Sequence, residues 1–287
     1  MEASRSGGTA EGTALMRAVH LSIDGDPKIF ADPLAASFLG PELATALKTT
    51  PQMFQTPALR SLRAVFVVRH RYAEDELAKA LARGVSQYVI LGAGLDSFAY
   101  RRPDLRQTLH VYEVDHPATQ QWKRQRLTDL GIAIPDNLTF IPIDFEVQTL
   151  AEGLAASTFR HDEPAFFSWL GVTQYLTADA VFSTLQDVAS STAPGSAIVF
   201  QIILPLSTLS AEDQAVVAVA SQHAAQQGEP WRSFFEPQAL ETQLRVMGFT
   251  EVCHFESAEA STRYFQGRTD GLQLPHYFEL ITARVGS

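Results

Sequence analysis

YVILGAGLDSFAYR, residues 88–101, is the stretch on which the interpretation of the whole sequence depends. An apolar run stops at two glycines, Gly92 and Gly94, and the chain turns acidic at Asp96. A short apolar run bounded by glycines is typical of a buried strand that ends in a tight turn. At the carboxyl end of a parallel strand, such a turn lets the backbone approach a nucleotide closely. We therefore expect a ligand to lie against this turn.

Outward from this stretch, apolar runs alternate with helical patterns. Besides the run that ends at Leu91, strands are expected at residues 110–114, 138–143, 165–170, 196–204, 249–255 and 277–283. Helices are expected at residues 73–82, 117–130, 178–189, 212–226 and 237–247. Strands separated by helices indicate a parallel sheet with helices on both faces. In such a sheet the ligand lies beyond the carboxyl ends of the strands, where the strand order reverses.

The composition excludes several classes of protein. With 287 residues, 46% of them hydrophobic, the chain can bury a substantial core as one α/β domain. A formal net charge of -10 argues against nucleic acid or an anionic membrane surface as a partner. No stretch reaches the ~18 apolar residues of a membrane span, and no apolar leader is present. The single cysteine, Cys253, allows no internal disulfide, so the cytoplasm is the expected location.

Three interpretations of the glycine turn compete. In the first, the glycines serve only the geometry of a tight turn. A dinucleotide site would need a third glycine at position 97, where Ser97 stands. A nicotinamide-dependent oxidoreductase is therefore disfavoured, and no Tyr-x-x-x-Lys pair supports it. A nucleoside without pyrophosphate, as in S-adenosylmethionine, has no phosphate to bind and needs no third glycine, so this interpretation is preferred.

Acidic residues at the ends of the next two strands strengthen the nucleoside interpretation. VYEVDHP puts Glu113 and Asp115 about 20 residues after the turn, where a carboxylate accepts hydrogen bonds from ribose hydroxyls. PIDF puts Asp144 where a carboxylate can accept from an adenine amino group, and Phe145 where a ring can pack against the base. A lone acid at a strand end is usually a solvated cap. In combination with the glycine turn, these acids indicate a nucleoside site.

Together these residues resemble the class I S-adenosylmethionine-dependent methyltransferases. Within that class they resemble the leucine carboxyl methyltransferase group with its bacterial small-molecule O-methyltransferases of the polyketide type. The resemblance covers nearly the whole chain. Its specific segments are LGAGLDSFAYR (91–101) and VYEVDHP (111–117). Weaker collinear segments are TALMRAVH (13–20), PKIFADPLA (27–35), VVRHRYAED (67–75), IPIDFE (141–146), SWLGVTQYLT (168–177) and RYFQGRTDGLQLP (263–275).

The resemblance implies a Rossmann-like, seven-stranded, mostly parallel sheet with helices on both faces, in one domain spanning 1–287. A loose tail at 1–12 would precede a helical N-terminal cap at 13–65. The cofactor-binding core would follow at 66–287, with a lid insertion at 205–236 between the fifth and sixth strands.

The resemblance also implies S-adenosyl-L-methionine as cofactor and S-adenosyl-L-homocysteine as product. Arg69 would bind the carboxylate of the methionine moiety, because a guanidinium can pair with both oxygens. Arg71 is the neighbour that could take its place. Gly92 and Gly94 would admit the methionine and ribose portions.

The remaining expected contacts follow the strand ends. Asp96 is counted with the cofactor-binding turn, Asp115 and Glu113 with the ribose, and Asp144 with Phe145 at the adenine. Family members of eukaryotes carry a Glu after the fourth strand that helps to position the cofactor.

The position that matches this Glu holds Leu170, which puts direct transfer of the protein-substrate activity in doubt. The expected activity is O-methyl transfer to a carboxylate or hydroxyl of a small, largely apolar acceptor. The alternatives are a protein C-terminal carboxyl methyltransferase and a non-catalytic S-adenosylmethionine-binding protein. A homodimer is left open.

Methyl transfer from a sulfonium is an in-line displacement that needs alignment and exclusion of water, so no catalytic triad is expected. We nominate no general base. Tyr175 is a candidate for lining the methyl channel, where an aromatic ring can face a cation. No Asp/Asn cluster follows the fourth strand, so no metal is expected.

Overall fold

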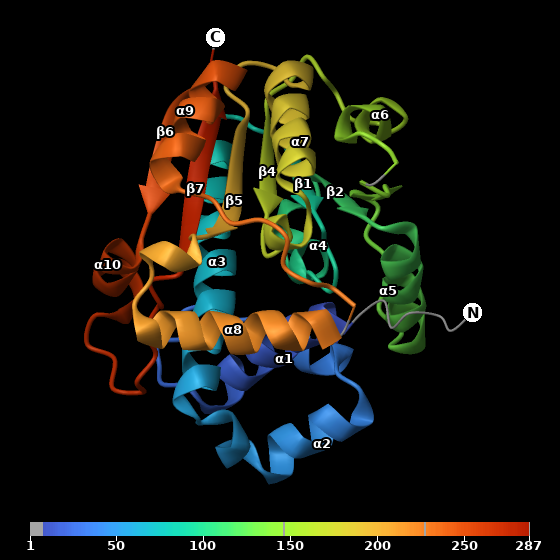
Figure 1. Ribbon diagram of the computed structural model, residues 1–287. Coiled ribbons are helices and arrows are strands. Elements are labelled where there is room, and N and C mark those ends of the chain that lie inside the picture. The colour runs from blue at the N-terminus through green and yellow to red at the C-terminus, as the bar shows by residue number, and fades with distance from the viewer. Residues whose placement is uncertain (1–7, 146, 227, 287) are drawn as a thin grey trace.

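The computed structural model describes residues 8–145, 147–226 and 228–286. In this part of the chain, seven strands form one sheet in the order β3-β2-β1-β4-β5-β7-β6 (Figure 1). The strands are β1 Gln87–Leu91, β2 His110–Asp115, β3 Leu138–Pro142, β4 Ala165–Trp169, β5 Ala197–Ile203, β6 Phe249–Phe255 and β7 Phe278–Val285. β1 to β5 are parallel, and β7 runs antiparallel to both β5 and β6. The expected seven-stranded, mostly parallel sheet is confirmed.

The helices in this part of the chain are α1 Gly8–Ile23, α2 Pro41–Thr49, α3 Pro57–Ala82, α4 Phe98–Arg101, α5 Pro117–Asp129, α6 Leu150–Ala155, α7 Ala178–Ser191, α8 Ala211–Gln226, α9 Pro237–Met247 and α10 Ser257–Ala260. Four helices, α5, α7, α8 and α9, lie within two residues of where the apolar patterns and their end signals predict them. Short turns of helix include η1 Ala35–Phe38, η2 Pro51–Phe54, η4 Thr173–Tyr175 and η5 Leu206–Thr208. α9 shows the signals at both ends, because the Glu236 side chain accepts from the amide of Ala239 and Gly248 ends the helix in a left-handed conformation.

Two helices differ from the expectation. α3 is 26 residues long, whereas the pattern predicts only residues 73–82. Its first half buries charged side chains, Arg63 and Arg69, which obscure the apolar stripe of an amphipathic helix. α1 begins at Gly8, inside the stretch expected to be a loose tail, and residues 1–7 lie outside the described residues.

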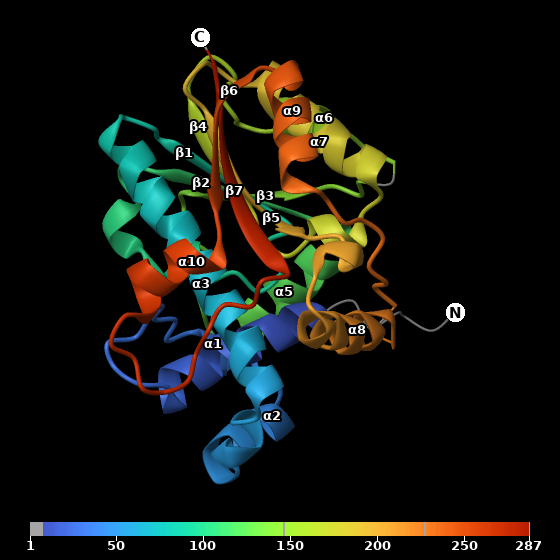
Figure 2. The same cartoon turned by 60° about the vertical axis from the view of Figure 1, so that its left-hand side comes forward.

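The two faces of the sheet carry separate apolar cores. Alternate residues of a strand point to opposite faces, so Tyr88 and Ile90 pack with α3, while Val89 and Leu91 pack with α6, α7 and α9. Figure 2 shows α3 on one side of the sheet and α7 and α9 on the other. Helices on both faces, as expected for this fold class, are therefore confirmed.

A third apolar cluster joins the N-terminal segment to the end of the sheet. Ala14 and Ala18 of α1 pack in it with Phe38, with Leu95 of the glycine turn and with Leu127 of α5. Figures 1 and 2 both show α1 and α8 beyond the carboxyl ends of the central strands. The ends of the strands are thus covered by segments that are far apart in the sequence.

None of the helices in the described ranges is both long and apolar enough to cross a lipid bilayer.

The core facing α9 gives a test of the fold. Leu244 is fully buried in that core, whereas Val246 on the same helix is 80% exposed. Leu244→Ala should lower the free energy of unfolding by about 2–5 kcal/mol, because it removes buried methyl groups and leaves a cavity. Val246→Ala should change it by less than about 0.5 kcal/mol. Urea denaturation measures both, and equal effects would contradict the burial described here.

Candidate functional site

The glycine turn after β1 is held by main-chain hydrogen bonds. Gly92 and Gly94 have φ of 65° and 45°, in the left-handed region that favours glycine. The amides of Gly92 and Ala93 donate to the carbonyl of Val114 at 2.8 and 3.1 Å. A Cβ at Gly92 would lie 2.3 Å from Cγ2 of Val172. The turn therefore crosses the ends of β2 and β4 with no room for a side chain at that position.

Asp115 closes the turn from the tip of β2. Its Oδ2 accepts from the amide of Gly94, and its Oδ1 accepts from the amide of His116 at 2.7 Å. Burial raises the pKa of the Asp115 carboxyl, although both amide hydrogen bonds oppose the shift. Each carboxylate oxygen has a further lone pair, so Asp115 can also accept from hydroxyl groups of a ligand.

Glu113 lies deeper than Asp115, behind the turn. It is 1% exposed, and its Oε2 lies 2.6 Å from Nζ of Lys123 in α5. Lys123 also donates to the carbonyl of Asp96 at 2.8 Å, so the ion pair is hydrogen-bonded to the main chain of the turn. Burial raises the pKa of Glu113 to about 7, against the attraction of Lys123. Glu113 therefore forms an ion pair with Lys123. A contact between Glu113 and the ribose stays a prediction.

Asp96 is turned toward the protein rather than toward open solvent. Its Oδ1 accepts from the amide of Phe98 at 2.7 Å, at the start of α4. Its Oδ2 lies 3.8 Å from Nε2 of His70, and the residue is 9% exposed.

Arg69 of α3 brings a buried guanidinium to the same end of the sheet. It donates to Oε1 of Gln201 at 3.2 Å and to Oγ1 of Thr13 at 3.4 Å. Its Nε has no hydrogen-bond partner, and no acid among the described residues forms an ion pair with it. A Cβ at Gly171, which has a φ of 73°, would lie 2.3 Å from Nη1 of Arg69.

No ion pair among the described residues therefore offsets the buried charge of Arg69, and Asp96 attracts it only from a longer distance. Burial lowers the pKa of Arg69 to about 9, so the group remains cationic at neutral pH. A buried cation without a counter-ion is costly, and an anionic ligand group would compensate it. Arg71, by contrast, is 45% exposed in its side chain and pairs with Asp75 at 2.9 Å. Of the two arginines, only Arg69 faces the strand ends.

Asp144 and Phe145 follow β3, next to β2 in the sheet. Oδ2 of Asp144 lies 3.7 Å from Nε2 of His116, and Phe145 is half-buried against the core. The order β3-β2-β1 therefore aligns Asp144, Asp115 and the glycine turn along one edge. Together with Arg69, this edge offers a cation, a glycine turn whose main chain a ligand can approach closely, two carboxylates and a ring. Such a set fits a ligand that joins an amino acid to a nucleoside.

The segment after β4 lies beside Arg69. Leu170 is half-buried against the core on the α3 side, and Tyr175 follows in η4. Burial raises the pKa of the Tyr175 hydroxyl, and Glu229, Gln174 and Arg69 are among the groups that act on it. The hydroxyl therefore stays protonated at neutral pH and can donate a hydrogen bond.

The chain that follows α8 is attached to this segment. The amide of Arg232 donates to the carbonyl of Gln174 at 2.6 Å, and Oγ of Ser233 donates to the carbonyl of Thr173 at 2.8 Å. Several buried polar atoms around Tyr175 lack a hydrogen-bond partner among the described residues. They are Nε of Arg69, Oε1 of Gln174 and Oε2 of Glu229. Donors and acceptors for a polar ligand group therefore surround Tyr175.

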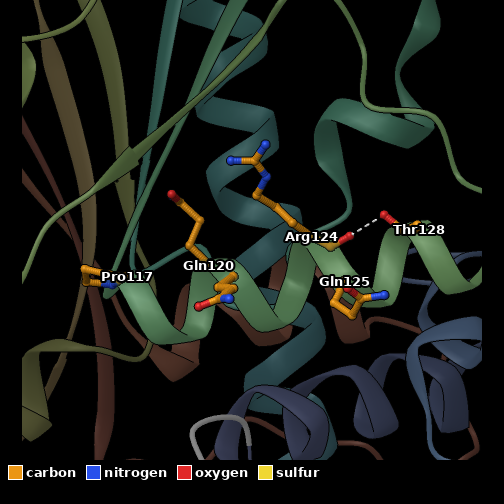
Figure 3. A pocket seen from close by; sticks show the side chains of 6 residues that line it. Pro117, Gln120, Arg124, Gln125 and Thr128 are labelled. Atoms are coloured by element: carbon orange, nitrogen blue, oxygen red, sulfur yellow. Dashed lines mark hydrogen bonds between the residues drawn. The ribbon is translucent and has the colours of Figure 1, made fainter.

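A separate pocket is lined by side chains of α5 (Figure 3). It has a volume of about 290 Å³, and its lining residues are Pro117, Gln120, Gln121, Arg124, Gln125 and Thr128. All six belong to one helix, and neither the glycine turn nor Arg69 contributes to it. The pocket is therefore distinct from the site at the strand ends.

Several residues at this site were not singled out from the sequence. Arg17, Asp32, Lys123 and Gln201 are buried polar side chains that contact the turn, one another or Arg69. A charged residue within an apolar stretch, such as Arg17 in TALMRAVH, is the signal that could have identified them. Within the residues described, no three His, Cys, Asp or Glu side chains form a group that could hold a metal ion.

Comparisons with known proteins agree with this geometry. The family model described as leucine carboxyl methyltransferase matches residues 10–189, more than half of the chain. A Bacillus subtilis protein named "Putative S-adenosyl-L-methionine-dependent methyltransferase YktD" is 35% identical over 250 residues, which cover 85% of this chain and 82% of that protein.

Two solved structures are similar in fold at low sequence identity. A "putative methyltransferase" from Thermobifida fusca has a TM-score of 0.58 at 17% identity and covers 99% of this chain and 97% of its own. The CurJ carbon methyltransferase has a TM-score of 0.53 at 17% identity, covering 97% of this chain and 67% of its own.

The buried pair behind the turn gives a pH-dependent test. Lys123→Met should lower the free energy of unfolding at pH 8 by about 3–5 kcal/mol, because it leaves Glu113 as a buried charge without a partner. At pH 5 the loss should be smaller, since a carboxyl whose pKa is raised by burial binds a proton in the folded state.

The double variant Lys123→Met/Glu113→Leu should recover most of the loss at pH 8. Urea denaturation at the two pH values measures all three proteins. A loss that is the same at both pH values would contradict this account of Glu113.

Proposed function

The chain belongs to the leucine carboxyl methyltransferase family, and on that premise we propose that it transfers a methyl group to a carboxylate or hydroxyl of a small, largely apolar acceptor. The protein is an S-adenosylmethionine-dependent methyltransferase. The observation that supports the proposal is the buried Arg69, which has no ion-pair partner, at the same end of the sheet as the glycine turn and Asp115. The amino acid carboxylate and the ribose are the two parts of the cofactor that these groups suit.

The roles proposed for the site residues follow from their chemistry. Arg69 binds the carboxylate of the methionine moiety. Gly92 and Gly94 carry no side chain, so the main chain of the turn can lie close to the cofactor. Asp115 accepts from the ribose hydroxyls. Asp144 accepts a hydrogen bond from the adenine amino group, and Phe145 packs against the adenine ring. Leu170 contributes apolar contact where a carboxylate stands in some family members.

When bound, the cofactor supplies a methyl group that is already electrophilic. The protein then needs to align the acceptor, exclude water and leave the nucleophile's path open. A carboxylate acceptor is ionised at neutral pH and needs no base, whereas a hydroxyl acceptor benefits from one. Tyr175 is proposed to line the path as a hydrogen-bond donor, because its raised pKa keeps the proton on its hydroxyl.

Residues 13–65 are proposed as a cap over the cofactor, and residues 205–236 as a lid over the acceptor. Support for the lid comes from its apolar side chains, since Trp231, Phe234, Leu209 and Val216 pack against the core on the α3 side together with Leu170. An apolar acceptor can replace some of these contacts. The unpartnered Oε2 of Glu229 would face its polar group.

The role of Arg69 can be tested without knowing the acceptor. Arg69→Gln should weaken the binding of S-adenosylhomocysteine by about tenfold to a hundredfold, because a hydrogen bond to a charged group contributes about 1.5–3 kcal/mol. Arg71→Gln, on the exposed side of the same helix, is the control and should bind as the wild type does. Isothermal titration calorimetry measures both, and the reverse result would move the carboxylate site to Arg71.

The acceptor class is tested with a labelled methyl donor. Small carboxylic acids, phenols and peptides with a free C-terminus are offered in parallel, and incorporation of label is counted. Uptake by small apolar acids or phenols is the expected result. Uptake by peptides alone would favour the protein C-terminal activity, and saturable cofactor binding without uptake by any of them would contradict the proposed acceptor class.

A further inference from the structure

We propose that Arg17 and Asp32 are positioning residues, which hold the back of the glycine turn and so set the affinity for the cofactor from outside the cofactor site. The inference rests on the cofactor site proposed above, whose own test is the Arg69 variant. Both residues belong to the N-terminal segment, and neither has been given a role in binding. Their contacts link α1 and the loop before η1 to the turn.

Arg17 reaches the turn directly from α1. It is 2% exposed, and its Nη2 donates to the carbonyl of Leu95 at 2.6 Å. Its Nε donates to Oδ2 of Asp32 at 2.8 Å, and its Nη1 lies 3.4 Å from Nε2 of His70. α1 also approaches the turn at Ala10, whose Cβ would lie 3.2 Å from a Cβ built at Gly94. The helix therefore lies against the turn at two points.

Asp32 forms the second connection. It is fully buried, and its Oδ2 accepts from Oγ of Ser97 at 2.7 Å as well as from Arg17. Its Oδ1 accepts from the amides of Leu34 and Ala35 at 3.1 Å each, which fixes the loop that carries it. Both carboxylate oxygens are thus used, and the charge is compensated by Arg17.

Ser97 is the residue that stands where a dinucleotide fingerprint would have its third glycine. In this chain its hydroxyl donates to Asp32 and accepts from Nε of Arg101 at 3.0 Å. A glycine could make neither contact. The departure from the dinucleotide pattern therefore attaches the turn to the N-terminal segment.

The turn is consequently fixed from two sides. Asp115 holds the turn through the amide of Gly94. Arg17 holds it through the carbonyl of Leu95, and Asp32 holds it through the hydroxyl of Ser97. Main-chain groups can bind a ligand tightly only if they are held in place before it arrives. Loosening the turn at Leu95 and Ser97 should therefore weaken cofactor binding, although Arg17 and Asp32 are not among the residues proposed to contact the cofactor.

The N-terminal segment contains a matched control. Arg63 donates from Nε and Nη2 to the two oxygens of Asp24 at 2.7 and 2.8 Å, and both side chains are buried. This ion pair joins α3 to the end of α1, as the Arg17 pair joins α1 to the loop before η1. It makes no hydrogen bond to the glycine turn.

The test compares Asp32→Asn with Asp24→Asn for thermal unfolding and for S-adenosylhomocysteine binding by calorimetry. Both variants should unfold at a lower temperature than the wild type, because each weakens a buried ion pair. Only Asp32→Asn should weaken binding, by about tenfold, while Asp24→Asn stays within about twofold. Ser97→Ala, which removes one hydroxyl and leaves the ion pair intact, should weaken binding by about threefold or more.

Ser97→Ala supplies the comparison if Asp32→Asn does not fold. Wild-type affinity in Ser97→Ala and in any folded Asp32→Asn would overturn the inference. An equal loss of affinity in Asp24→Asn would also overturn it, because general destabilisation of the N-terminal segment would then be sufficient. Normal binding of S-adenosylhomocysteine by Arg69→Gln would instead contradict the proposed cofactor site. The comparison of Asp32→Asn with Asp24→Asn could still be interpreted in that case.

Discussion

The hydrogen bonds between the glycine turn and the end of β2 are the interaction on which the site depends. The amides of Gly92 and Ala93 use the carbonyl of Val114, and Gly94 uses the carboxylate of Asp115. They join the carboxyl ends of β1 and β2 next to β4, at the point where the strand order reverses. Because the turn is pinned to β2, every segment that contacts the turn is placed relative to the acid that is proposed to bind the ribose.

Buried charge distinguishes the structural part of this region from the binding part. Arg17 and Arg63 are paired with acids and connect the N-terminal segment to itself and to the turn. Lys123 is paired with Glu113 behind the turn. Arg69 is also buried, yet its hydrogen-bond partners are an amide and a hydroxyl, and its guanidinium lies over the ring of Phe66. This arginine without an ion pair is the one that we propose binds the carboxylate of the cofactor.

Local patterns in the sequence were sufficient to predict the strands, the glycine turn and the ends of α5, α7, α8 and α9 to within two residues. The apolar run that ends at Leu91 and the glycines after it are local signals, and Gly248 ends α9 where the pattern predicts. The first half of α3 and the start of α1 could not be predicted in this way. Arg17 and Arg63 acquire partners from other segments of the chain, Arg17 from Leu95 and Arg63 from Asp24. Glu113 was expected at the ribose from its place at the strand end, and the sequence pattern did not show that Lys123 of the next helix pairs with it.

The position of β7 has a consequence for how the protein forms during synthesis. β7 lies between β5 and β6, although it is the last strand to be made. β5 therefore has an open edge, and β6 has no neighbour, until residues 278–285 have left the ribosome. The nascent chain can assemble β1 to β5 earlier, but β6 can join the sheet only after residues 278–285 are available to pair with it. Until then the edge of β5, whose residues are all buried in the finished protein, is exposed to chaperones and to other chains.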